Sequence, residues 1–111
     1  MTMNRTIAIF LVLAADFFPG PVSGKGKIKV ACIGNSVTYG YTLEDPATES
    51  YPAVLQRSLG DGYDVENFGH SGATLLRHGH NPYYLTPEFT RAVRFAADIA
   101  VIDLGLNDTD P

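Results

Sequence analysis

The sequence predicts an α/β protein in which parallel strands form a sheet with helices on both faces. Two apolar runs, residues 28–33 and 99–104, are typical of buried strands, and residues 63–68 alternate apolar and polar side chains. Helix-start signals lie between these segments, so strands and helices alternate along the chain. Such alternation indicates parallel strands joined by right-handed crossovers.

Residues 1–24 have the layout of a secretory signal peptide. They carry a positive charge, then nine apolar residues (7–15) that are too few to span a bilayer, then small residues at a cleavage site. Asp16, beside the apolar segment, is unusual, and an uncleaved anchor or a misassigned start is the alternative interpretation. We expect a signal peptide over residues 1–24, one domain over residues 25–111, and a secreted or periplasmic protein.

Composition excludes several classes of function. The chain has 111 residues, 45% hydrophobic and 18% charged, with a net charge of −4. The negative charge argues against nucleic acid or an anionic membrane as a partner, and we expect neither after signal cleavage. Cys32 is the single cysteine, so an internal disulfide is excluded and a small buried side chain is expected. The acidic loop 41–49 has no histidine near it, so we expect no metal and no cofactor.

The first half of the predicted fold contains two strands and one helix. Residues 27–33 form the first strand, which becomes apolar on both faces towards its end. Ser50, followed by a proline inside the first turn, begins a helix that Gly60 ends. The second strand, residues 63–68, is expected nearer the sheet edge. The apolar face of the helix is expected to comprise Ala53, Val54, Leu55 and Leu59.

The second half contains a helix and a third strand. Residues 73–85 have no clear pattern beyond a possible short helix at Leu75. Thr86 followed by Pro87 begins a helix. The third strand, residues 99–104, is apolar on both faces and is therefore expected to be central in the sheet. The inward side of the helix is expected to comprise Phe89, Val93, Ala96 and Ala97.

A loop containing glycine follows each predicted strand, and the three loops should meet at one edge of the sheet. Ser36 in the first loop is a candidate nucleophile, because the glycines around it allow a sharp turn that exposes the hydroxyl. Gly69 could present a backbone N–H, and Asn107 could donate its uncharged amide to an oxyanion. Each residue also has a simpler interpretation, as a helix cap, a tight turn and an Asx turn respectively.

Three blocks of this sequence resemble the SGNH hydrolase superfamily, also called GDSL-type esterases. Residues 33–40 resemble its first block, with Asn35 where the commoner form has aspartate; residues 67–74 resemble the second, and residues 104–108 the third. The resemblance covers residues 27–110 and implies a three-layer α/β/α flavodoxin-like fold that hydrolyses esters through an acyl-serine. By the same resemblance Ser36 is nucleophile and first oxyanion donor, and Gly69 and Asn107 complete the oxyanion hole.

Residues 51–84 are also similar to bacterial sialate O-acetylesterase-like proteins. The similar stretch includes Leu75-Leu76 and Pro82-Tyr83-Tyr84. The similarity implies a carbohydrate ester as substrate and removal of O-acetyl groups outside the cytoplasm.

The sequence departs from the family in one large respect. The family takes its catalytic histidine and aspartate from an Asp-x-x-His block, which these 111 residues do not contain. His70, His78 and His80 lie between the second and third blocks, and none is assigned as general base. A central third strand would also lack a neighbour on one side. We therefore expect the amino-terminal part of a larger esterase domain, inactive by itself.

Two other interpretations remain open from the sequence. One is a flavodoxin-like protein that binds a phosphate or nucleotide through Ser36 and Thr38, although the usual glycine-rich fingerprint is absent. The other is a sugar-binding module that keeps the pocket without the catalytic base.

Overall fold

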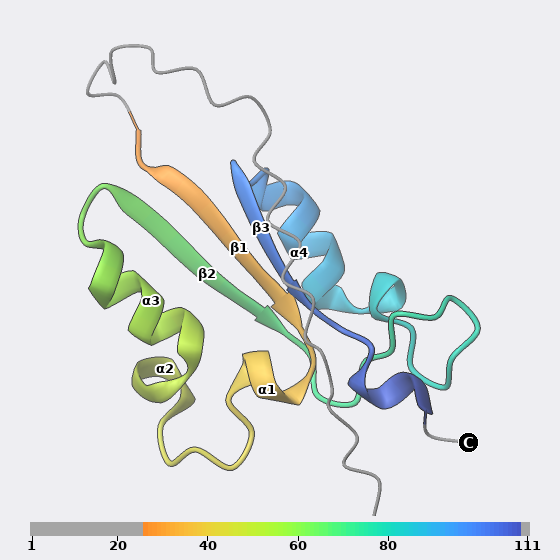
Figure 1. Ribbon diagram of the computed structural model, residues 1–111. Helices are drawn as coiled ribbons and strands as arrows, with labels where there is room; N and C mark the ends of the chain where they lie inside the picture. Colours follow the sequence, from red (N-terminus) through yellow and green to blue (C-terminus); the bar gives the residue numbers. More distant parts are fainter. Residues whose placement is uncertain (1–25, 110–111) are drawn as a thin grey trace, which may run out of the picture.

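A computed structural model of the protein describes residues 26–109, and the expected signal peptide, residues 1–24, lies outside this part. Three parallel strands form the sheet in the order β2-β1-β3 (Figure 1). Their bounds are β1 (Ile28–Gly34), β2 (Tyr63–Gly69) and β3 (Ile99–Asp103). The predicted α/β architecture with a parallel sheet is confirmed.

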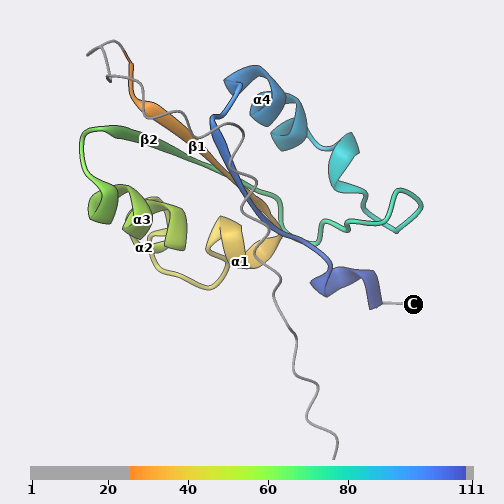
Figure 2. The same ribbon diagram turned by 45° about the horizontal axis from the view of Figure 1, so that its top comes forward.

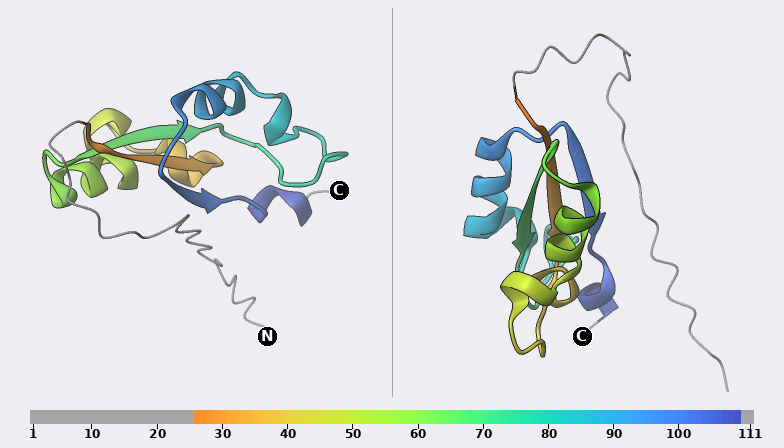
Figure 3. Two further views of the ribbon diagram at one scale, coloured as in Figure 1. Left: turned by 90° about the horizontal axis from the view of Figure 1, so that it is seen from above. Right: turned by 90° about the vertical axis from the view of Figure 1, so that its left-hand side faces the viewer.

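Helices cover both faces of this sheet. α3 (Tyr51–Leu59) lies on one face and α4 (Pro87–Phe95) on the other, as the end-on view in Figure 3 shows. The short helix α2 (Pro46–Glu49) lies beside α3, and α1 (Ser36–Tyr39) follows the carboxyl end of β1 (Figure 2). Single turns of 3-10 helix occur at Tyr83–Leu85 and Leu106–Thr109.

The core lies between the sheet and α4. Ala31 of β1, Phe68 of β2 and Ala92 of α4 form its buried centre. The rings of Phe68 and Phe95 are 5.4 Å apart in a tilted arrangement, which aromatic pairs favour. Cys32 is fully buried, as its position in the first strand predicted.

Both long helices begin where the sequence predicted, and α3 also ends there, but α4 ends at Phe95, before Ala96 and Ala97, which were expected on its inward side. The predicted inward faces are also partly wrong. Val54 and Leu59 of α3 are 44% and 38% exposed, and Phe89 and Val93 of α4 are 39% and 62% exposed. In α4 the side chains on the sheet are instead those of Ala92 and Phe95. Each nine-residue helix meets only part of a narrow sheet, so a single stripe of side chains is buried and neighbouring apolar positions face solvent.

The start of α3 differs in detail from the prediction. Ser50 occupies the N-cap position, but its side chain makes no capping hydrogen bond. The residue is buried, and its hydroxyl lies 3.4 Å from the Asn67 side-chain nitrogen, which donates to it. A tertiary contact with β2 therefore replaces the local cap.

The third strand is not central in the described sheet. β1 is the middle strand, and β3 lies at an edge with all five residues only half-buried. Its apolar composition matches two covered faces, whereas α4 packs on β1 and β2. The sequence analysis also missed α1 and α2, since four-residue helices are too short for a periodic pattern. They rest on the side-chain caps of Asn35 and Asp45.

Within residues 26–109, no helix combines the length and apolar character that crossing a membrane requires.

Candidate active site

The first strand-end loop places Ser36 at the start of α1, two residues beyond Gly34. The side chain of Asn35 accepts a hydrogen bond from Val37 N at 3.0 Å, which caps the helix. Asn35 is fully buried, whereas Ser36 is half-buried. A Cβ on Gly34 would overlap the Thr38 side chain, so only glycine permits this tight turn. The local geometry holds Ser36 at the end of the central strand with its side chain partly accessible.

The second loop packs directly against α1. Gly69 is buried, and a Cβ there would lie within 2.8 Å of backbone atoms of Thr38 and Tyr39. The next residue, His70, donates its backbone N–H to Gly34 O at 2.9 Å. The second loop is therefore joined to the strand that precedes Ser36.

The Gly69 N–H already has a partner within its own strand. It donates to Asn67 Oδ1 at 2.9 Å. The amide nitrogen of Asn67 donates in turn to Thr38 O at 2.8 Å. Asn67 thus connects β2 to α1. It also accepts the hydrogen bond from the Gly69 N–H, the group that the sequence analysis assigned to an oxyanion.

The third loop is held against the second by two adjacent side chains. The Asn107 amide donates to Ala73 O at 3.1 Å. The carboxylate of Asp108 accepts from Leu75 N at 2.8 Å and from Leu76 N at 3.1 Å. Asn107 has a second amide N–H, so its bond to Ala73 does not exhaust its capacity to donate.

The structure therefore brings together the three loops that carry Ser36, Gly69 and Asn107. Backbone bonds across the sheet join them, including Asn35 N to Asp103 O at 3.3 Å. The sequence analysis missed the connecting roles of Asn67 and Asp108. The available signal was the polar side chain of Asn67 at a position of β2 where the alternating pattern predicts an apolar residue. Its partners, however, are as distant as 29 residues along the chain.

A polar contact links the helix that carries Ser36 to α3. The hydroxyls of Thr38 and Tyr51 are 3.2 Å apart and link α1 to α3. Burial raises the pKa of the Cys32 thiol to about 11, although a hydrogen bond with Tyr51 lowers it. Cys32 is therefore an uncharged thiol at neutral pH.

The amide nitrogen of Asn35 has no hydrogen-bond partner among the described residues.

The histidines are not joined to Ser36. His70 Nδ1 lies 2.7 Å from Glu88 Oε2 on α4, and Arg91 lies 3.4 Å from the other oxygen of this carboxylate. Burial tends to raise the pKa of Glu88, but its backbone hydrogen bond, His70 and Arg91 together lower it below the usual range. His78 and His80 are exposed in the loop before Asn81. In the described part of the chain, no three potential metal-ligating side chains form a cluster.

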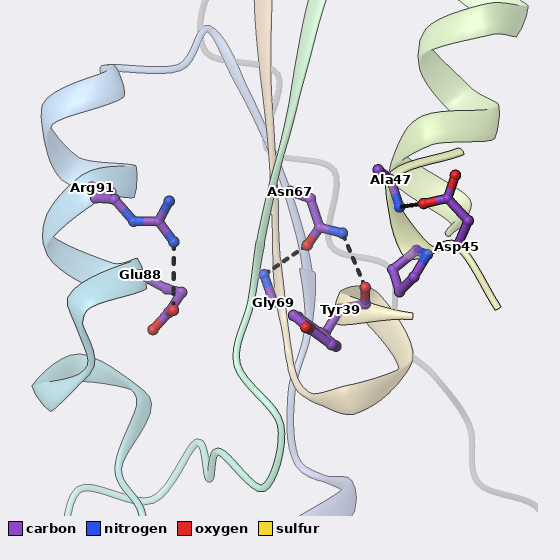
Figure 4. A pocket seen from close by; sticks show the side chains of 8 residues that line it. Tyr39, Asp45, Ala47, Asn67, Gly69, Glu88 and Arg91 are labelled. Atoms are coloured by element: carbon purple, nitrogen blue, oxygen red, sulfur yellow. Dashed lines mark hydrogen bonds and ion pairs between the residues drawn. The ribbon is translucent and has the colours of Figure 1, made fainter. Parts of the chain in front are cut away.

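A hollow of about 410 Å³ adjoins Gly69 at the edge of β2. Figure 4 shows Tyr39 and Gly69 in its middle, Asp45 on the α2 side, and Glu88 with Arg91 on the α4 side. Its volume falls within the range of about 300–1,000 Å³ that is usual for small-molecule sites.

A parallel sheet in the order β2-β1-β3 with helices on both faces is the arrangement of a flavodoxin-like α/β protein. Residues 32–111 match the model of the GDSL-like lipase/acylhydrolase family. The chain therefore belongs to the GDSL-like lipase/acylhydrolase family.

One relative is similar over most of this chain. The chain is 46% identical over 91 residues to an acetylxylan esterase of Xylanibacter ruminicola. The aligned region is 82% of this chain and 19% of that protein, so the chain spans about a fifth of its relative's length. No solved structure matches the chain significantly.

Proposed function

We propose that this chain carries the nucleophile and the oxyanion donors of an enzyme that removes O-acetyl groups from carbohydrates. One observation carries the proposal: Ser36 is half-buried at the end of the central strand, beside the loops of Gly69 and Asn107. Membership of an acylhydrolase family supports ester hydrolysis. A signal peptide over residues 1–24 would export the esterase domain from the cytoplasm.

In this proposal the Ser36 hydroxyl oxygen attacks the acetyl carbonyl carbon and forms a tetrahedral oxyanion. The N–H of Ser36 is available because the first N–H groups of a helix have no partner within it. Asn107 contributes its second amide N–H, and the Gly69 N–H turns from Asn67 or is shared with it. The intermediate then collapses to an acetyl-serine as the sugar hydroxyl leaves with a proton, and water releases acetate.

The reaction needs a base to take the Ser36 proton. Among the described residues, the Ser36 hydroxyl makes no hydrogen bond to a histidine, and the ring of His70 is held by Glu88. The family resemblance assigns the base to an Asp-x-x-His block, which residues 1–111 lack. We propose that residues 1–111 alone do not turn over substrate.

Two carbohydrates are candidates for the acetylated substrate. Acetylated xylan is favoured because the relative at 46% identity is an acetylxylan esterase. An O-acetylated sialic acid, which the resemblance of residues 51–84 implies, is the alternative.

The geometry argues against phosphate binding at the first loop. α1 has four residues, and the Asn35 side chain already accepts the Val37 N–H that a phosphate would use. Tight binding of a nucleotide or flavin would contradict this argument and favour the flavodoxin-like alternative.

The test is acetate release from acetylated xylan by the gene product that includes the in-frame sequence after Pro111. We expect an Asp-x-x-His block in that sequence. Ser36→Ala should lower kcat by about 10³-fold or more. Ser71→Ala, at an exposed serine of the second loop, should leave kcat unchanged. Activity of Ser36→Ala equal to that of an active parent would overturn the mechanism, and no acetate release by the parent would favour a non-catalytic sugar-binding module.

A further inference from the structure

The hollow beside Gly69 contains groups that the proposed reaction at Ser36 does not use. The Tyr39 side chain ends α1 and is 48% exposed. Asp45 and Arg91 are exposed on opposite sides of the hollow (Figure 4). An aromatic ring between hydrogen-bond acceptors and donors suits a sugar ring, which has apolar C–H faces and hydroxyls around its rim.

The polar groups of the hollow retain unused hydrogen-bonding capacity. Asp45 accepts from Ala47 N and from the Thr48 hydroxyl, and a carboxylate has about four acceptor positions. Arg91 has five N–H donors and uses one on Glu88. Its guanidinium lies 6.0 Å from the centre of the Phe68 ring, which limits its orientation. Arg91 is thus partly positioned before any ligand arrives.

The charge of the hollow distinguishes neutral from acidic sugars. Two carboxylates, Asp45 and Glu88, face it with one guanidinium, that of Arg91. Glu88 is ionised at neutral pH because its pKa is lowered, and it already pairs with Arg91. The local charge is therefore negative, and the carboxylate of a sialic acid would meet repulsion there.

The hollow is lined by the last residue of the helix that carries Ser36, although Ser36 itself does not line it. Gly69 borders both the hollow and the proposed oxyanion hole. Ser36 and Tyr39 are the first and last residues of α1, a rise of about 4.5 Å along the helix axis. A sugar whose ester lies at Ser36 would place its own ring, or the next one, against Tyr39.

We propose that this hollow binds a neutral pyranose unit of the carbohydrate that carries the ester. The proposal rests on the proposed esterase function and selects a neutral polysaccharide such as xylan over a sialic acid as its substrate. Tyr39 provides the apolar platform, and Asp45 and Arg91 hydrogen-bond to sugar hydroxyls from opposite sides.

The test is titration of the isotope-labelled 111-residue chain with xylotetraose, followed by NMR of its backbone amides. We expect saturable shifts at Tyr39, Gly69 and Arg91, and at least tenfold weaker binding of N-acetylneuraminic acid. Tyr39→Ala should weaken xylotetraose binding at least tenfold. Tyr41→Ala should not, because Tyr41 is 67% exposed and lies outside the hollow. Arg91→Gln, on the opposite side of the hollow from α1, should also weaken xylotetraose binding.

Three results would overturn the proposal: no saturable shifts at these residues, equal binding by the parent and both hollow variants, or equally tight binding of N-acetylneuraminic acid. Xylotetraose has no ester, so its binding does not depend on Ser36. If Ser36→Ala loses acetate release but the parent does not bind xylotetraose, the sugar site alone is overturned. If the parent binds xylotetraose but Ser36→Ala releases acetate as fast as the parent, the esterase mechanism alone is overturned.

Discussion

Replacing Gly69 with alanine should destabilise the fold through close contacts with the backbone of α1. The added Cβ would lie 2.7 Å from Tyr39 Cα and 2.8 Å from the carbonyl carbon of Thr38. Both atoms belong to the backbone of α1, so relief requires moving the helix that carries Ser36. Overpacking of this kind costs about 1–3 kcal/mol. For a domain of this size, a loss of about 2 kcal/mol lowers Tm by about 8–16 °C.

The assay is thermal unfolding of the 111-residue chain followed by circular dichroism. Gly62→Ala is the matched control, because a Cβ at Gly62 would meet nothing within 4 Å. This control should keep or slightly raise Tm, since alanine restricts the unfolded chain. Equal Tm values for Gly69→Ala and Gly62→Ala would refute the argument that only glycine fits between β2 and α1.

Three further predictions concern side chains around the site. Asp108→Ala removes a charged acceptor of two backbone N–H groups, those of Leu75 and Leu76. The free energy of unfolding should therefore fall by about 1–3 kcal/mol, and amide hydrogen exchange should accelerate at residues 73–76. Unchanged exchange there would contradict the conclusion that Asp108 holds the second loop. Because the pKa of Glu88 is lowered in the fold, its stabilisation is present above its unfolded pKa and is lost as pH falls through the folded value. Urea unfolding should therefore show Glu88→Gln less stable than the parent at pH 7, with a difference that shrinks as the pH is lowered below the ordinary glutamate pKa of about 4.3. Glu66→Gln, at an exposed strand position, is the control and should be as stable as the parent at pH 7. Cys32 is fully buried with its pKa raised to about 11, so iodoacetamide at pH 8 should label it only in denaturant; rapid labelling of the folded chain would show that the strand opens.

The features that the sequence predicted well depend on neighbouring residues. Thr86 was predicted to begin a helix, and its side chain indeed accepts a hydrogen bond from Phe89 N at 3.2 Å. Gly60 ends α3 with a positive φ of 81°, a conformation that glycine adopts without strain. Caps and turn residues act within one helical turn, so a single sequence carries most of their signal, although a tertiary contact replaces the cap at Ser50.

The features that the sequence predicted poorly depend on what packs against them. Val54 and Val93 are apolar residues at helical spacing, but both side chains are exposed, 44% and 62% respectively. β3 has the composition of a central strand, yet its place at an edge depends on the other strands present. The partners of a helix or strand lie far along the chain, and apolar periodicity does not identify them.

By itself, the sequence determined the alternation of strands and helices, the strand-end positions of Ser36 and Gly69, and the candidate role of Asn107 as a donor. Only the tertiary structure decided how these positions are connected. It showed that Asn67 accepts the hydrogen bond of the Gly69 N–H and that Asp108 accepts hydrogen bonds from the second loop. It also showed that a negatively charged hollow adjoins Gly69. The physical reason is that strand-end loops are specified by local turn chemistry, whereas hydrogen bonds and hollows between loops arise when the sheet brings distant segments together.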